Sequence, residues 1–166
     1  MRLIVVVTAL LFAALPVHAD QVSDDADAIA ACMGDAWPRD ARALCAGAVS
    51  APCQLALGAE STESMNLCLA READAWNAVM ERQFPELMQR AREVDAAGAA
   101  SAGLESAAEA LENAQRAWQL YRDAECRFAR ASWGDGGFRA VALSACVLDL
   151  TARRAVDFQA RLLTGG

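Results

Sequence analysis

The sequence predicts an all-α protein, a disulfide-stapled bundle of three main helices with a short helical N-terminal extension. The first observation behind this prediction is that apolar side chains recur every three or four residues in the long segments after residue 60, which is the spacing of one helix face. The second is that no stretch of alternating Val, Ile or Thr competes as a strand. The third is an even number of cysteines, six, which in an exported chain is typical of disulfides.

The N-terminus has the pattern of a secretory signal peptide. An apolar run from Leu3 to Leu15 follows a single arginine and leads into small residues. This pattern predicts a signal at residues 1–19 that is cleaved off. The run is too short for a comfortable membrane span, and Asp20 after the predicted cut is not a cysteine that could carry a lipid. We therefore expect a periplasmic or secreted protein without a membrane anchor.

The predicted mature chain is acidic and contains no lysine. Cleavage takes away one of the 15 basic residues, Arg2, and the single histidine, His18; the remaining 14 arginines against 22 acids give a net charge of −8. An acidic surface disfavours nucleic acid and anionic lipid and suits a basic partner. Because no histidine remains and the cysteine spacings match no zinc motif, we expect no metal site and no cofactor.

The N-terminal extension, residues 20–52, is predicted to consist of short helical pieces. Ser23 and the aspartates after it favour a helix through Cys32, and Asp40 is a candidate cap for a second helix through Val49. Glycines and prolines interrupt the segment between them.

The first main helix of the remaining domain, residues 53–166, is predicted to follow a cap at Ser61 or Thr62. Pro85 removes a backbone donor and clashes with the preceding turn, so we expect a kink or a break near Phe84. The apolar face of this helix consists of Met65, Cys68, Leu69, Trp76, Val79, Met80, Phe84, Leu87, Met88, Ala91 and Val94.

Two further helices are predicted after the glycine-containing loop at residues 96–103. The second helix starts at Leu104, and the three glycines at residues 131–138 predict a turn before the third helix, which runs from Phe138 to Leu163. The predicted buried stripe of the second helix is Leu104, Ala107, Leu111, Ala114, Trp118, Tyr121, Glu125 and Phe128.

The segment AQRAWQLYRDAEC, residues 114–126, concentrates aromatic and charged side chains in the second helix. Helical spacing places Trp118 on the buried stripe with Glu125, and puts Arg122 at the border where it can pair with Glu125. In the first helix, Glu72 occupies an equivalent position between a cysteine and a tryptophan. The residues expected to lock the helices together are Trp118, Arg122, Glu125, Arg154, Glu72 and Trp76.

The two acids on the predicted stripes also allow an enzymatic interpretation. Glu72 and Glu125 have the residue type of a general acid and base pair, as in glycoside hydrolysis. Acids with nearby arginines more often form ion-pair networks, and no histidine is left to activate a nucleophile. We therefore expect no catalytic residue.

The glycine-rich turn is either an exposed probe for a partner or only a connector between two helices. Trp133, Asp135 and Phe138 are the candidate partner-binding residues, since an exposed aromatic ring beside an acid favours a contact role. The turn lacks the Lys-Ser/Thr that follows the glycines of a phosphate-binding loop.

Over residues 53–163 the sequence resembles the lysozyme inhibitor LprI-like family of exported bacterial proteins. The residues that carry the resemblance are Cys53, Met65-Asn66-Leu67-Cys68, Glu72, Trp76, the segment AQRAWQLYRDAEC, Gly136-Gly137, and CVLDLTARR with Cys146, Thr151 and Arg154. The resemblance implies a small helical domain with disulfides Cys53–Cys68 and Cys126–Cys146, which leaves Cys32 and Cys45 as the remaining pair.

For function, the resemblance implies binding and inhibition of lysozyme. The first hypothesis is therefore a protein that binds a basic lysozyme and protects the cell envelope. The second is a periplasmic adaptor that binds another envelope component without inhibiting it, which the same acidity and disulfides allow. A carboxylate-based enzyme is the third. The sequence leaves the oligomeric state open.

Overall fold

The computed structural model describes residues 17–35, 43–58, 61–98 and 105–164. Over these ranges the chain forms helices and no strands, which confirms the predicted all-α class. Residues 1–16 of the predicted signal peptide, the predicted cap Asp40 and Leu104 lie outside the described residues. The helices are α1 (Val17–Asp35), α2 (Ser50–Leu57), α3 (Thr62–Ala96), α4 (Ala107–Ala131) and α5 (Arg139–Thr164).

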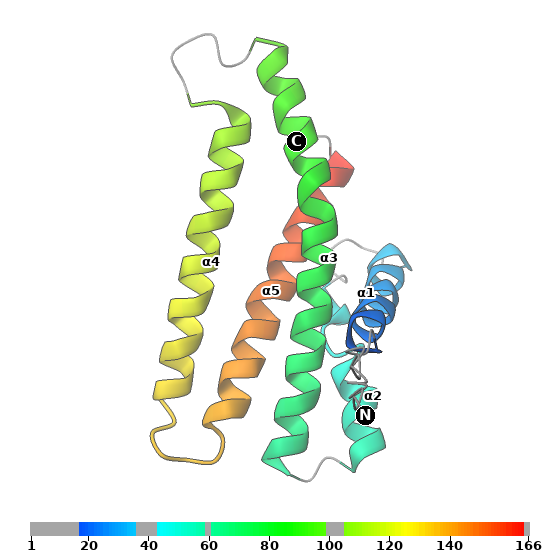
Figure 1. The fold of residues 1–166 in the computed structure, drawn as a ribbon, viewed down its shortest axis with the longest axis vertical. Helices are drawn as coiled ribbons and strands as arrows, with labels where there is room; N and C mark the ends of the chain where they lie inside the picture. The colour runs from blue at the N-terminus through cyan, green and yellow to red at the C-terminus, as the bar shows by residue number, and fades with distance from the viewer. Residues whose placement is uncertain (1–16, 36–42, 59–60, 99–104, 165–166) are drawn as a thin grey trace, which may run out of the picture.

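Three long helices form the body of the molecule. α3, α4 and α5 run side by side along its long axis, and the predicted glycine-rich turn joins α4 to α5 at one end (Figure 1). α1 and α2 pack against α3, on the side away from α4 (Figure 1). The two short N-terminal helices therefore thicken one side of the three-helix body.

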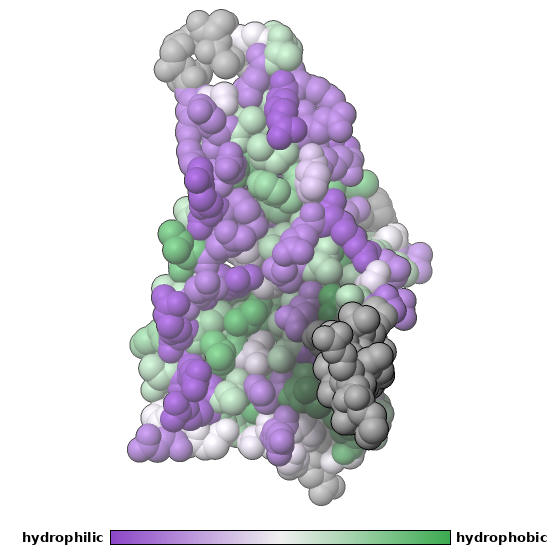
Figure 2. Space-filling view, viewed as in Figure 1, coloured by the Kyte–Doolittle hydropathy of each residue, from purple (hydrophilic) through white to green (hydrophobic). Residues whose placement is uncertain are grey.

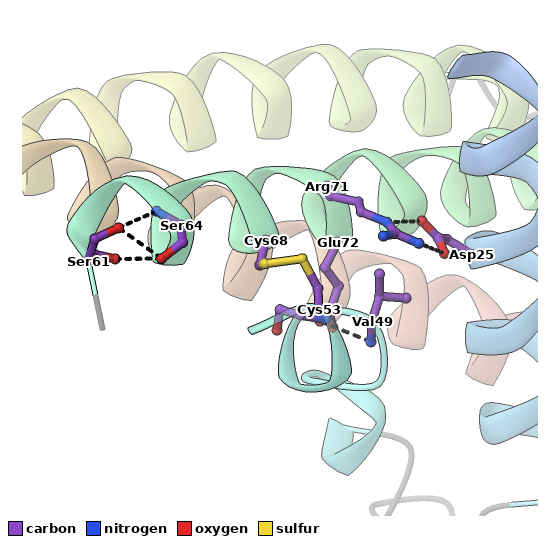
Figure 3. Close-up of a disulfide and its surroundings, with 9 residues drawn as sticks. Asp25, Val49, Cys53, Ser61, Ser64, Cys68, Arg71 and Glu72 are labelled. Carbon is purple, nitrogen blue, oxygen red and sulfur yellow. Dashed lines mark hydrogen bonds and ion pairs between the residues drawn. A yellow bond between two sulfur atoms is a disulfide. The ribbon is translucent and has the colours of Figure 1, made fainter. Parts of the chain in front are cut away.

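One apolar core joins the N-terminal helices to the long ones. Trp76 of α3 and Phe158 of α5 are fully buried, and Ile29 and Met33 of α1 belong to the same buried cluster. Outside this cluster, Asp25 of α1 accepts two hydrogen bonds from the Arg71 guanidinium of α3 at 2.6 and 2.7 Å (Figure 3). These hydrogen bonds raise the pKa of Arg71 above its ordinary value, although burial opposes the shift.

Three disulfides connect neighbouring elements. Cys32–Cys45 links α1 to the segment before α2, Cys53–Cys68 links α2 to α3, and Cys126–Cys146 links α4 to α5. The last two are the pairs that the family resemblance implied, and the first is the pair that remained after them. Because each bridge joins residues only 13 to 20 positions apart, each restrains a local loop of the unfolded chain.

α3 runs through Pro85 as one helix. Of the predicted kink or break near Phe84, the break is therefore wrong. The helix begins as expected at Ser61, whose hydroxyl accepts the Ser64 N–H at 3.1 Å. The Phe84 ring stacks on Phe158 with centroids 6.0 Å apart, and Gln83 donates to Gln159 at 3.0 Å. After the proline, Arg90 donates a hydrogen bond to the Leu162 carbonyl oxygen. Contacts with α5 on both sides of Pro85 thus hold the helix together, although a proline disfavours a continuous helix.

The buried face of α4 differs from the predicted stripe. Gln115 and Cys126 are buried and Trp118 is half-buried, whereas Tyr121 and Phe128 are 55% and 67% exposed. The inner positions therefore follow steps of three and four through residues 111, 115, 118, 122 and 126. The predicted stripe differs because it included Tyr121 and Phe128, which the structure exposes. The Cys126–Cys146 disulfide and the contact with α5 fix this rotation.

Candidate functional site

Glu72 is a fully buried carboxylate that holds the start of α2. Its Oε1 accepts N–H hydrogen bonds from Gly47 at 2.6 Å and from the Trp76 indole at 3.1 Å. Its Oε2 accepts from Ser50 at 2.6 Å and from Val49 at 3.3 Å (Figure 3). α2 has no side-chain cap of its own, so Glu72 satisfies amides that a helix N-terminus otherwise leaves free.

This arrangement corrects two expectations from the sequence. Glu72 pairs with backbone and indole N–H groups and takes no part in the ion-pair network with arginines that the sequence favoured. The segment before α2, residues 43–49, forms a short 3₁₀ turn and further turns in place of the predicted helix. Gly47 has a φ of 105°, a conformation that ends a right-handed helix, and it brings successive amides toward one carboxylate.

Trp118 lies between two arginines on the inner side of α4. The guanidinium carbon of Arg122 is 5.1 Å from the Trp118 ring centroid, and that of Arg154 is 5.6 Å away. Arg154 also lies 4.7 Å from the Phe158 ring and donates to Gln115 at 3.1 Å. The Arg154–Trp118 contact and the Arg154–Gln115 hydrogen bond join α5 to α4, and a cation–π contact is worth about 0.5–2 kcal/mol.

Burial lowers the pKa of Arg154 from its ordinary value, the like charge of Arg161 adds to the effect, and Asp157 opposes it.

Glu125 takes part neither in the contacts around Glu72 nor in the cluster around Trp118. It is exposed on α4, and Arg122 donates instead to Asp123 at 3.0 and 3.1 Å. The predicted Arg122–Glu125 pair is therefore wrong, because the rotation of α4 turns Glu125 outward. Glu72 has no access to solvent and its oxygens are occupied by N–H donors, so the two acids do not form a shared site.

The turn between α4 and α5 presents aromatic rings to solvent. Trp133 and Phe138 are 53% and 39% exposed, and their ring centroids lie 5.3 Å apart. Gly134 has a φ of 53°, and a Cβ added at Gly136 would lie 3.0 Å from the Trp133 carbonyl oxygen. These two glycines therefore permit the tight turn, and Asp135 between them is exposed.

A groove between α3 and α4 was not predicted from the sequence. It has a volume of about 300 Å³, and its apolar lining includes Met80, Phe84 and Pro85. Glu81 of α3 and Glu112 of α4 supply two acidic groups to it, and Arg116 of α4 supplies one basic group. Figure 2 shows apolar surface along the seam between these helices, with hydrophilic side chains on both sides. Because its two walls are some thirty residues apart in sequence, only the packing of the helices reveals it.

Two further observations concern the described part of the chain. No group of three His, Cys, Asp or Glu side chains in it is arranged to hold a metal ion. None of its helices combines the length and the apolar character that a membrane span requires.

These features define a small, disulfide-stapled helical protein. Its buried polar groups, such as Glu72, hold helices in place, and the groove and the α4–α5 turn are accessible from solvent. The model of the family described as lysozyme inhibitor LprI matches residues 53–158, and the chain belongs to this family. A relative from Rhizobium meliloti (strain 1021), named uncharacterized protein R02472, is 28% identical over 102 residues, which are 61% of this chain and 73% of the relative. No solved structure matches the chain.

Proposed function

We propose that this protein is exported, binds a lysozyme and slows its hydrolysis of the cell wall. Membership of the lysozyme inhibitor LprI family supports a lysozyme-like partner. Three disulfides support an oxidising compartment outside the cytoplasm. The structural observation that carries the proposal is the acidic groove between α3 and α4.

The groove has the chemistry to receive an arginine or lysine side chain of a basic partner. Met80, Phe84 and Pro85 offer apolar surface to the aliphatic stem, while Glu81 and Glu112 attract the charged end. Arg116 lies 3.8 Å from Glu112, but both side chains are more than half exposed, so this ion pair is weak. The net negative charge adds a long-range attraction that salt screens.

The glycine-rich turn is a less suitable contact for a basic protein. Trp133 and Phe138 have the exposure that the sequence-based prediction requires. However, Arg127, Arg130 and Arg139 line the adjacent hollow, so the charge around the turn is opposite to that of the groove. We therefore place the lysozyme contact at the groove and keep the turn, with Asp135, as the alternative that mutation separates.

The test is a lysozyme activity assay with protein purified from the periplasmic fraction, whose intact mass also checks cleavage before Asp20. We expect inhibition that weakens with added salt. The double variant Glu81→Gln and Glu112→Gln should inhibit about tenfold less. The basic side chain of the lysozyme would then be buried at the interface without a carboxylate partner, which costs affinity. Its matched control, Asp24→Asn with Glu125→Gln, changes the net charge equally at exposed acids outside the groove and should inhibit as the unmodified protein does.

Each other result has a definite meaning. No inhibition of any lysozyme at protein excess rejects the proposed function, and binding without inhibition favours the adaptor hypothesis. An equal loss of inhibition in the two double variants would show that inhibition depends on the net charge of the protein and not on the groove. If replacing Trp133 or Phe138 with Ala lowers inhibition while the groove variant inhibits fully, lysozyme contacts the turn and not the groove.

A further inference from the structure

Three arginines converge at the tip of the α4–α5 hairpin. Arg127 and Arg130 of α4 and Arg139 of α5 line one hollow of about 190 Å³ with Ala131 and Gly134. Since a water molecule takes up about 30 Å³ of liquid, this hollow has room for an oxyanion group. Within the described residues, none of the three guanidinium groups makes a hydrogen bond or an ion pair.

The absence of carboxylate partners is notable in a chain with an excess of acids. Of the nine other arginines in the described part of the molecule, six have such a partner: Arg71, Arg82, Arg90, Arg116, Arg122 and Arg153. Arg92, Arg154 and Arg161 have none, but they do not line this hollow. The three at the tip are cationic side chains. Like charges around one hollow repel each other, so an anion placed there would relieve the repulsion.

The helix ends add to this preference. Arg139 is the first residue of α5, where the backbone dipole already places partial positive charge, and the first turn of α5 contains no acidic residue. A cation at that position is unfavourable, whereas an anion is attracted both by the guanidinium groups and by the helix start. Arg130 in the last turn of α4, by contrast, is compatible with its own helix dipole.

Exposed aromatic rings surround the same tip. Trp133 and Phe138 contact each other there, and Phe128, one turn earlier on α4, is 67% exposed. A soluble anion needs only the arginines and leaves this apolar surface in water. A lipid surface uses both, because its phosphate groups suit guanidinium ions and its headgroup region accommodates aromatic side chains.

We propose that the tip of the α4–α5 hairpin docks on an anionic phospholipid surface. The three arginines bind lipid phosphates, and Trp133 and Phe138 enter the headgroup layer. The tip is one end of an elongated molecule (Figure 1), so end-on docking keeps most of the acidic surface away from the lipid. Glu112 lies on α4 about 27 Å from Arg130 at 1.5 Å per residue, which leaves the α3–α4 groove free. This inference does not depend on lysozyme binding.

The experiment is co-sedimentation of the disulfide-bonded protein with vesicles. Vesicles of phosphatidylcholine with one third phosphatidylglycerol should bind the protein, pure phosphatidylcholine should bind it far less, and salt should weaken binding. Replacing Arg127, Arg130 and Arg139 with Gln should lower the partition coefficient about fivefold per arginine, roughly a hundredfold in all. Trp133→Ala should lower it further.

The matched control replaces Arg92, Arg153 and Arg161 with Gln, which changes the net charge equally away from the tip; its binding should be unchanged. Far-ultraviolet circular dichroism verifies that both triple variants are folded. Unchanged binding of the tip variant, or equal binding to both kinds of vesicle, would overturn the proposal. Tip-dependent binding of inorganic phosphate without vesicle binding would also overturn it and indicate a site for a soluble anion.

Discussion

Replacing Glu72 with Ala tests whether one buried carboxylate holds the start of α2. Glu72 accepts four N–H hydrogen bonds, two of them 2.6 Å long, from elements that are 4 to 25 residues away in sequence. Truncation to Ala removes all four acceptor contacts at once. The segment at residues 47–50 then has no polar partner on α3, although the Cys53–Cys68 disulfide still tethers it.

The magnitude follows from the donors that are left without a partner. Ser50 and Trp76 are 5% and 0% exposed, so water cannot easily replace the carboxylate at their N–H groups. A buried unsatisfied donor costs about 1–3 kcal/mol, which gives about 4 kcal/mol for these two. The buried Val49 N–H, whose hydrogen bond to Glu72 is longer at 3.3 Å, adds to this cost. Gly47 is only partly buried, and its N–H can turn to water. Glu72→Gln should cost about 2 kcal/mol, because the amide retains one acceptor oxygen but turns its NH₂ group toward N–H donors.

Urea denaturation followed by circular dichroism measures both losses. Glu125→Ala is the matched control, since Glu125 is exposed and should change the unfolding free energy by less than about 0.5 kcal/mol. Hydrogen exchange adds a local measurement: the Val49 and Ser50 amides should lose protection in Glu72→Ala. A free energy of unfolding within about 1 kcal/mol of the unmodified protein, with these amides still protected, would refute the reasoning.

Two further predictions concern the connection of α4 to α5. Replacing Cys126 and Cys146 together with Ser opens a loop of 20 residues and should cost about 3 kcal/mol, which calorimetry detects as a lower midpoint with helicity retained; an unchanged midpoint would argue against a structural role. Arg154→Ala removes two cation–π contacts and one hydrogen bond and should cost about 2 kcal/mol in urea denaturation. Arg154→Lys should recover only part of this, because an ammonium group lacks the planar face that stacks on Trp118; full recovery would show that charge alone matters.

The sequence by itself determined the elements that depend on local rules. Apolar spacing identified the three long helices, the cap at Ser61 marked the start of α3, and the glycines after Ala131 marked the turn. These features need only neighbouring residues, because caps, turns and helix faces repeat over short distances. The cysteine count also indicated a stapled fold before any contact was known.

Only the tertiary structure decided how the faces of the helices are used. Packing on α5 carries α3 through Pro85, and the disulfide with α5 turns α4 so that Glu125 faces solvent. Glu72 finds amides from the segment before α2, and the groove and the arginine hollow each take their walls from two different helices. A rotation of one residue moves a helix position by about 100°. Which side chain is buried or paired is therefore set by the neighbouring helix, whose position a local sequence pattern does not contain.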